Sequence, residues 1–310
     1  NNSKYATWNW KGDTSTPNIT YTVKVADYTG NNQTGGSNNK YEFNDFSQQA
    51  VTLDLQEGGV YTFNMDDSSN ASHPFSIGTA ANGTVYTSGI TYSLDGVSKT
   101  YSEYTSWFAS ATTRRLVFTV PSAAPALYYW CSVHSGMGGS INTNSIKGSS
   151  NFSGTIQSKV QSNITAGFSI INYVGTGANS SDLTIGHGLS TTPRMVIVKN
   201  RTDSSTRWQV YHEDLSADAT YTKKNLLLNS SSAQSGYASQ IKAVSATTFT
   251  VRDTDSNGNA FVNKSSSNYT AFVFAEVEGF SRIGSYEGNN SSSDNAFVFT
   301  GFLPSFVAIK

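Results

Sequence analysis

The fold class of this chain is indicated by one stretch, Val51-Thr-Leu53-Asp-Leu55-Gln-Glu-Gly-Gly-Val60-Tyr61-Thr-Phe63-Asn-Met65. In both of its halves, large apolar residues alternate with polar ones, so every second side chain can point into a core. Other short apolar or alternating runs, separated by Gly- and Asn-rich turns, fall at residues 21–25, 116–120, 127–130, 195–198, 225–228, 249–251 and 269–277. Windows with the period of a helix are missing. The sequence therefore predicts an all-β chain built from tandem β-sandwich domains.

The composition excludes several classes of function. The 310 residues carry a net charge of −1, and charged residues make up 13%, about half the usual share. A chain with so few charges and no excess of positive charge does not favour binding to the phosphates of a nucleic acid. We therefore expect no nucleic-acid partner. No apolar run approaches the roughly 18–20 residues that span a bilayer, so we expect no membrane insertion. The single cysteine, Cys131, excludes an internal disulfide framework and is either an inert core residue or a ligand.

An internal repeat organises the second half of the chain. Residues 167–199 and residues 279–310 share the pattern Gly-Phe-Ser-x-Ile, then Gly followed by an apolar residue, a Pro, and an apolar run that ends in Lys. The first glycines are 112 residues apart and the final lysines 111. The opening Tyr5-Ala-Thr-Trp8-Asn-Trp10 also resembles Tyr269-Thr-Ala-Phe272-Val-Phe274. The sequence thus predicts parts of three copies of one repeat.

The repeat fixes the expected domain boundaries. We expect the last strand of a preceding copy at residues 1–13, an inserted domain at 19–142, and a Ser/Asn/Gly-rich linker at 143–166. One complete sandwich of lectin-like or jelly-roll type is expected at 167–279. Residues 280–310 are expected to be the truncated start of a further copy, with a strand at Phe306–Lys310, in a sequence that is part of a longer chain.

Potential metal ligands gather at the end of the inserted domain. The sequence there reads Leu127-Tyr-Tyr-Trp-Cys131-Ser-Val-His134-Ser-Gly-Met137, and His73 lies 58 residues before Cys131. One thiolate, two imidazoles and a weak thioether form the ligand set of a trigonal copper site with a long axial bond. With Cys at the end of a strand, a single tight loop can supply three of these ligands, and His73 would come from a neighbouring strand.

These residues resemble the cupredoxin (blue-copper) family over 19–142, specifically its amicyanin-like Cys-x-x-His-x-x-Met loop after an aromatic strand. The resemblance implies a Greek-key sandwich with His73, Cys131, His134 and Met137 as copper ligands. The chain departs from the family at Pro74, where Asn is usual, and at Ser135-Gly136, where Pro or bulky residues are common. The alternative is a sandwich of the same shape in which Cys131 and Met137 are soft core residues.

Two acidic motifs have weaker interpretations. Asp253-Thr-Asp255-Ser-Asn257-Gly258 matches the first half of a calcium loop, but its twelfth position is Lys264 rather than a bidentate Glu. Glu276 and Glu278 share one strand face, which could suit glycoside hydrolysis but is more typical of a solvated surface. We expect neither motif to be a site, and no enzymatic activity.

The remaining candidates are histidines and aromatic residues outside the copper motif. His187 and His212 belong to no recognisable triad, and a surface position is expected for each. Exposed aromatic residues beside polar loops could stack on sugars or be ordinary sandwich rims: Trp107, Tyr211, Tyr221 and Tyr237.

The repeat carries a second resemblance. Its pattern, from Gly167-Phe-Ser-Ile through His187-Gly-Leu and Pro193-Arg-Met-Val-Ile-Val-Lys to Tyr269-Thr-Ala-Phe-Val-Phe274, resembles a domain of large virion structural and tail-fibre-type proteins of marine tailed bacteriophages. Those proteins often carry cupredoxin-like inserts. The resemblance implies a non-enzymatic virion or extracellular protein with other virion subunits, a homo-oligomer and a host-surface glycan or protein as partners. The alternative is a secreted copper-binding or electron-transfer cupredoxin.

Overall fold

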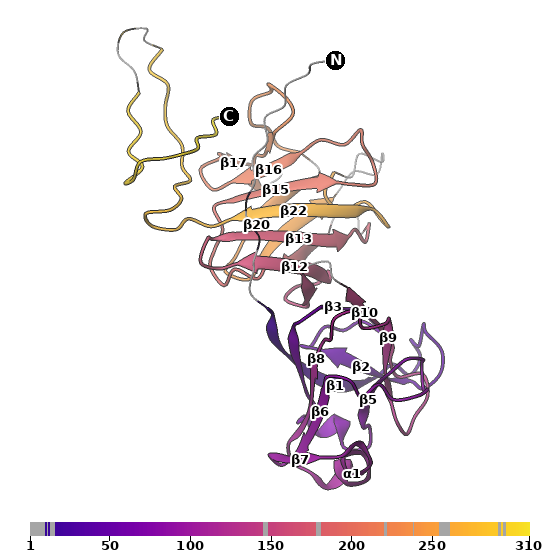
Figure 1. Cartoon of the computed structure of the whole chain (residues 1–310). Helices are drawn as coiled ribbons and strands as arrows, with labels where there is room; N and C mark the ends of the chain where they lie inside the picture. Colours follow the sequence, from indigo (N-terminus) through magenta and orange to yellow (C-terminus); the bar gives the residue numbers. More distant parts are fainter. Residues whose placement is uncertain are drawn as a thin grey trace, which may run out of the picture. The chain divides into compact units, whose positions relative to one another are not determined.

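A computed structural model of the chain describes residues 10, 12, 16–144, 148–177, 181–219, 222–237, 239–253, 261–290, 293 and 296–310. The chain divides into two compact units. We call residues 15–152 the first unit, and residues 1–14 with 153–310 the second unit. The regular secondary structure of the described residues is strand apart from one short α-helix and two 3-10 turns, which confirms the prediction of an all-β chain of sandwich type (Figure 1).

The first unit is a two-sheet sandwich. Its larger sheet contains β1 (Asn18–Asp27), β2 (Asn39–Phe43), β4 (Val60–Asn64), β6 (Ile90–Leu94), β7 (Val97–Lys99) and β8 (Arg114–Thr119), in the order β2-β1-β4-β8-β6-β7. Its smaller sheet contains β3 (Leu53–Gln56), β5 (Phe75–Gly78), β9 (Leu127–Cys131) and β10 (Gly139–Asn144), in the order β3-β10-β9-β5. The pairs β1–β4 and β3–β10 are parallel. A short strand, β11 (Ser149–Asn151), lies beside β3, where Ser150 Oγ accepts a hydrogen bond from the Asp54 N–H.

Aromatic side chains fill the space between these two sheets. The alternation along β4 buries Tyr61 and Phe63, and the Phe63 ring stacks on Phe75 of the opposite sheet at 4.9 Å between centroids. The buried tyrosines also satisfy their hydroxyls: Tyr129 Oη donates to the Val51 carbonyl at 2.9 Å and Tyr104 Oη to the Phe75 carbonyl at 3.1 Å. Each of these hydrogen bonds holds a core side chain against one backbone carbonyl. The core therefore fixes the positions of the strand ends as well as the packing of the two sheet faces.

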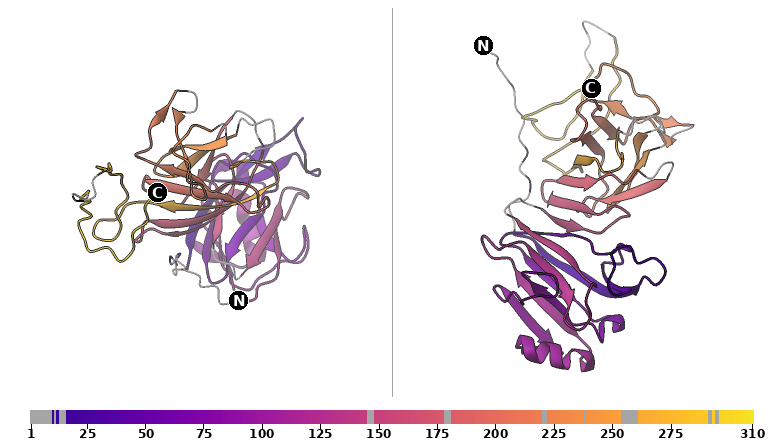
Figure 2. Two further views of the ribbon diagram at one scale, coloured as in Figure 1. Left: turned by 90° about the horizontal axis from the view of Figure 1, so that it is seen from above. Right: turned by 90° about the vertical axis from the view of Figure 1, so that its right-hand side faces the viewer.

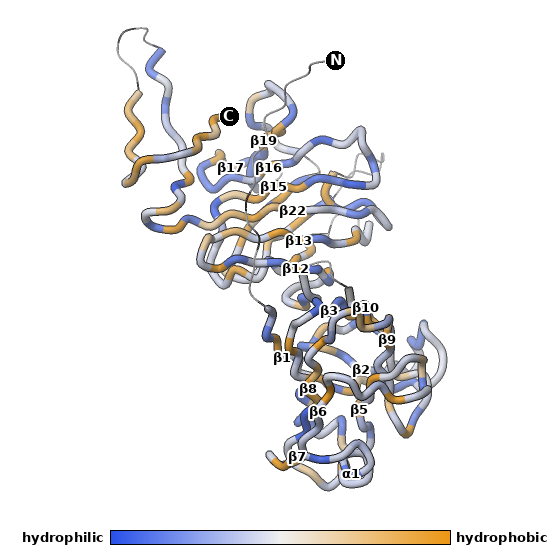
Figure 3. The backbone as a smooth tube through the Cα atoms, in the orientation of Figure 1, coloured by the Kyte–Doolittle hydropathy of each residue, from blue (hydrophilic) through white to orange (hydrophobic). Residues whose placement is uncertain are grey.

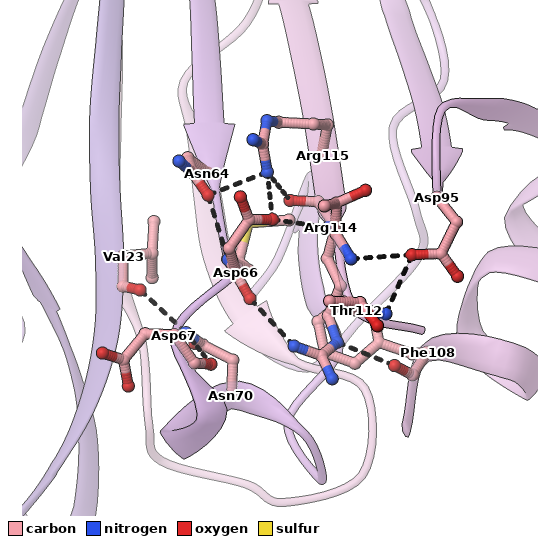
Figure 4. Close-up of polar contacts among 12 residues, drawn as sticks. Val23, Asn64, Asp66, Asp67, Asn70, Asp95, Phe108, Thr112, Arg114 and Arg115 are labelled. Atoms are coloured by element: carbon pink, nitrogen blue, oxygen red, sulfur yellow. Dashed lines mark hydrogen bonds and ion pairs between the residues drawn. The ribbon is translucent and has the colours of Figure 1, made fainter. Parts of the chain in front are cut away.

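The helical segments of this unit are η1 (Ser68–Asn70), α1 (Tyr101–Trp107) and η2 (Phe108–Ser110); α1 is seen as a coiled ribbon in Figure 2. Polar contacts hold the segments before η1 and after η2 (Figure 4). The buried Arg114 donates from Nε to the Phe108 carbonyl at 2.8 Å and from a terminal nitrogen to the Met65 carbonyl at 3.3 Å. Asp66 accepts from the Arg114 N–H at 2.8 Å and pairs with Arg115. The segment that leads from β4 into η1 is therefore anchored to β8.

The second unit has two principal sheets. Its strands are β12 (Ser158–Asn163), β13 (Phe168–Val174), β14 (Asp182–Gly186), β15 (Met195–Asn200), β16 (Gln209–His212), β17 (Ala217–Asp218), β18 (Thr222–Lys223), β19 (Leu226–Leu227), β20 (Ser239–Val244), β21 (Thr248–Asp253) and β22 (Asn268–Phe274). The order β12-β13-β22-β15-β16-β19 forms the main sheet, β14-β21-β20 the second, and β17-β18 a hairpin. Tyr173 of the main sheet packs against Phe249 of the second at 6.3 Å between ring centroids, inside one shared core.

The secondary structure differs from the sequence prediction in two places. The linker predicted at 143–166 contains the end of β10, all of β11 and β12, because a Ser- and Asn-rich segment can satisfy its backbone in a sheet without an apolar pattern. Phe306–Lys310 is not a strand. The strand predicted at 1–13 lies, except for Trp10 and Gly12, outside the described residues. Across the described ranges, no helix is long and apolar enough to cross a membrane.

Candidate metal centre

Strand pairing brings His73 and Cys131 together. Cys131 is the last residue of β9 and lies opposite Phe75 of β5, and the Ser132 N–H donates to the Pro74 carbonyl at 3.0 Å. His73 enters β5 from the turn after η1, where its N–H donates to the Asn70 carbonyl at 2.8 Å. Residues that are 58 positions apart therefore become neighbours at one sheet edge.

The three predicted nitrogen and sulfur ligands form a compact cluster. The Nδ1 atoms of His73 and His134 lie 3.8 Å and 3.7 Å from Cys131 Sγ. Their ring centroids are 4.7 Å apart. The ligand atoms all lie within 4.8 Å of one another, a spacing that could hold a metal ion. An ion about 2.3 Å from sulfur and about 2.0 Å from nitrogen, with a bond angle of about 120°, gives a sulfur–nitrogen separation of about 3.7 Å. The cluster therefore fits one ion in trigonal geometry.

The cluster is enclosed on one side and open on the other. The side chains of His73 and Cys131 are 8% and 2% exposed, whereas His134 is exposed. Burial, and then the neighbouring His134, lower the pKa of His73 below its ordinary value. The His73 imidazole is thus neutral near pH 7, as a metal ligand must be.

Met137 is fully buried in the aromatic core of the first unit, together with Cys131. Its carbonyl accepts a hydrogen bond from the Tyr41 N–H at 3.1 Å, so its backbone is fixed beside β2. Its role as an axial ligand stays a prediction.

Tyr41 supports the cluster, although the sequence pattern did not single it out. Its buried hydroxyl donates to the His73 carbonyl at 2.8 Å. Burial, and then the nearby Cys131 thiol, raise the pKa of Tyr41, so the hydroxyl stays protonated and keeps donating. Tyr41 therefore positions the backbone of one ligand while its own N–H holds Met137.

A buried lysine clamps the ligand loop, residues 132–137. The side chain of Lys40 is fully buried, and its ammonium donates to the Gly35 carbonyl at 2.5 Å and to the Gly136 carbonyl at 2.6 Å. The Ser37 N–H adds a bond to the Ser135 carbonyl at 3.2 Å. These contacts hold the loop at Ser135-Gly136, the two positions where bulky residues are absent.

Glycine is required at the point where this loop meets the segment before β2. Gly136 has a φ of +76°, and a Cβ built on it would lie 2.7 Å from Gly36 Cα. A side chain there would meet both backbone strain and a steric clash. The loop conformation is therefore set by two facing glycines and the Lys40 ammonium, a signal visible only in three dimensions.

The other candidate residues are placed as follows. His187 was expected at the surface, and that prediction is wrong: the side chain is fully buried, its Nε2 lies 3.1 Å from the Ser245 carbonyl, and its Nδ1 accepts from the Leu189 N–H at 3.2 Å. His212 is half-buried. His187 contacts the turn between β20 and β21 through Ser245 and Thr247, which the local sequence could not reveal.

The structure describes the two acidic motifs only in part. Glu276 pairs with Arg282 at 3.2 Å and with Arg194 at 3.8 Å, and Glu278 is exposed beyond the end of β22. Of the calcium-loop sequence, only Asp253 is described, and it is buried; residues 254–258 lie outside the described residues.

The aromatic residues considered for sugar stacking differ in how exposed their side chains are. Trp107 is 58% exposed, and the Lys99 ammonium lies 4.7 Å from its ring centroid. Tyr211 was expected to be exposed but is buried, because it lies on β16 in the core of the second unit. Tyr237 is half-buried, and Tyr221 lies outside the described residues.

Comparison with known proteins adds one match. No curated protein and no solved structure is similar to the chain. Residues 142–310, more than half of the chain, match the sequence pattern of a family described as a domain of unknown function, DUF7483. The matched residues contain the 153–310 part of the second unit and begin after all four predicted copper ligands. The chain therefore belongs to the DUF7483 family and carries the candidate metal centre in the residues that precede the family's domain.

Proposed function

We propose that the first unit is a copper-binding, cupredoxin-like module. The observation that carries this proposal is the convergence of His73, Cys131 and His134 at distances that suit one trigonal ion. A thiolate with two imidazoles is the donor set that blue-copper sites use, with a weak axial thioether that Met137 would supply. The position of Cys131 at the end of an aromatic strand of a two-sheet sandwich supports the same assignment.

The residues around the cluster would give the bound copper a fixed geometry. Tyr41 holds the His73 backbone, and Lys40 holds the Gly136 carbonyl, so the ligands are arranged before an ion arrives. A copper ion in such a site supplies one-electron chemistry and strong thiolate-to-metal absorption. Here His134 is the exposed ligand.

Copper titration of the full chain tests this proposal. After chelator treatment, one equivalent of Cu(II) is expected to produce an intense blue absorption band that is absent from the Cys131→Ser variant. His212→Gln, which changes a half-buried histidine of the second unit, is the matched control and keeps the band. No 1:1 binding, or binding that Cys131→Ser leaves intact, would overturn the copper assignment. Retention of Zn²⁺ against added copper would also overturn it.

For the whole chain we propose a non-enzymatic role as a modular β protein of a virion appendage. The tandem β units and the repeat support this role, since polar, weakly charged sandwiches stay folded outside a cell without disulfides. Antibodies raised against the chain are expected to label the appendages of purified particles. Labelling of a secreted fraction instead, with reversible copper redox chemistry, would favour the electron-transfer alternative.

A host-binding role of this protein has its own test. Full-length chain is expected to bind a subset of glycans on an array if it acts as an adhesin. Particle labelling without glycan or host-protein binding would limit its role to structure.

A further inference from the structure

The two segments that carry the candidate ligands contain no charged residue. Residues 70–78 include His73, residues 127–144 include the other three predicted ligands, and neither segment contains Asp, Glu, Lys or Arg. In Figure 3 the tube of β9 is accordingly pale to orange, the colours of intermediate and apolar residues. In such surroundings one fixed charge has a large effect on an ion, because few other charges oppose it.

Lys40 supplies one fixed charge to these surroundings. It lies on β2, and its buried ammonium donates to the Gly136 carbonyl at 2.6 Å. Gly136 precedes Met137 directly and follows His134 by two positions. The positive charge is therefore hydrogen-bonded to the loop that supplies the predicted ligands.

In the part of the chain that the structure describes, no carboxylate pairs with Lys40. Its ammonium bonds two backbone carbonyls, those of Gly35 and Gly136. Glu42, two positions further along β2, accepts instead from the Tyr28 hydroxyl at 2.5 Å. Burial lowers the pKa of Lys40, as expected for an ammonium that no neighbouring acid stabilises. Carbonyl dipoles offset a buried ion only in part, so a net positive charge remains beside the loop.

Holding the loop does not by itself require a charge. A neutral amide side chain could donate to the same carbonyls, whereas a buried ammonium loses the free energy of its hydration. Lys40 is nevertheless a charged residue in a chain in which charged residues make up only 13%. The charge of Lys40 therefore exceeds what the clamp on Gly136 requires.

A fixed positive charge distinguishes the two oxidation states of copper. With the Cys131 thiolate and two neutral imidazoles, the centre would carry one net positive charge when it holds Cu(II) and none when it holds Cu(I). A neighbouring ammonium repels the first form more than the second, so it favours the reduced ion. The soft thiolate and thioether donors favour Cu(I) as well.

We propose that the ammonium of Lys40 sets the oxidation-state preference of the candidate copper centre, so that the first unit binds Cu(I) more tightly than Cu(II). This inference rests on the proposed copper-binding function and adds the form of copper that the site retains. Lys40 is not a ligand in this assignment. It acts through its charge, from a position fixed by the Gly35 and Gly136 carbonyls.

The affinities of the full chain for both copper ions test this role. Competition with chelators measures the two dissociation constants, and a redox titration of the copper-loaded chain measures the reduction potential. In Lys40→Met the preference for Cu(I) is expected to fall about tenfold, which corresponds to a potential lower by about 59 mV for one electron. Lys24→Met is the matched control and keeps the potential, because Lys24 lies on the neighbouring strand β1 in an exposed pair with Asp45.

A second variant, Lys40→Gln, separates the charge from the clamp. Gln keeps N–H donors for the two carbonyls but has no charge, so its potential is expected to fall as far as that of Lys40→Met. A fall in Lys40→Met alone would assign the effect to a loosened loop and overturn the proposal. Equal potentials in the unchanged chain and both variants would also overturn it. A chain that binds neither copper ion would overturn the proposed function as well, so the two failures are distinguishable.

Discussion

Replacing Lys40 with Met is expected to loosen the candidate metal centre without touching a ligand. Met keeps most of the buried stem but removes the ammonium that bonds Gly35 and Gly136. Gly35 is exposed, so its carbonyl can take a water; Gly136 is only partly exposed. Losing a charged hydrogen bond costs about 1.5–3 kcal/mol. We therefore expect Lys40→Met to lower the free energy of unfolding of the first unit by about 2 kcal/mol.

Urea unfolding of the metal-free full chain, followed by circular dichroism, measures this loss. Hydrogen exchange locates it: amides of residues 35–41 and 132–138 are expected to exchange faster, because Ser37 and Tyr41 donate to the ligand loop. Lys24→Met is the matched control, since Lys24 makes an exposed pair with Asp45 and such pairs contribute at most about 1 kcal/mol. If Lys40→Met changes stability no more than Lys24→Met does, the clamp has no energetic role and the reasoning is refuted.

Two further predictions concern other buried groups. Tyr41→Phe removes the hydroxyl that bonds the His73 carbonyl, so stability should fall by about 1 kcal/mol and calorimetry should show weaker Cu(II) binding; unchanged binding would contradict the positioning role. In the second unit, burial lowers the pKa of His187. Because the unfolded chain then binds the proton more readily, this histidine's contribution to stability is present above about pH 6.5 and lost as pH falls below it. The thermal midpoint should therefore drop between pH 7 and pH 5, and His187→Gln should flatten that slope; an identical slope in the variant would count against it.

The fold class could be predicted, and two of the three clustered candidate ligands could be singled out, because their signals are local. Alternation along residues 51–65 marks half-buried strands wherever they end up in space. The spacing of Cys131 and His134 places two ligands on one short loop, and the structure brings both to His73.

The remaining features depend on contacts between distant residues. Lys40 lies in a polar, Asn-rich stretch, and nothing in that stretch indicates that its ammonium is needed by a loop 96 positions away. His187 has the sequence context of a turn residue, but its side chain is buried against Ser245, in the turn between β20 and β21. Phe306–Lys310 has the apolar pattern of a strand but is not a strand in the structure.

The parallel pair β3–β10 has a kinetic consequence for the metal centre. Ile141 pairs with Leu53, and Cys131 with Phe75, so both contacts close loops of more than fifty residues. Such non-local pairings form slowly, and the ligands meet only when the sheet is nearly complete. An ion that binds there would bind only after most of the sheet has formed, so it would not speed folding. A bound ion would instead slow the unfolding of the completed sandwich.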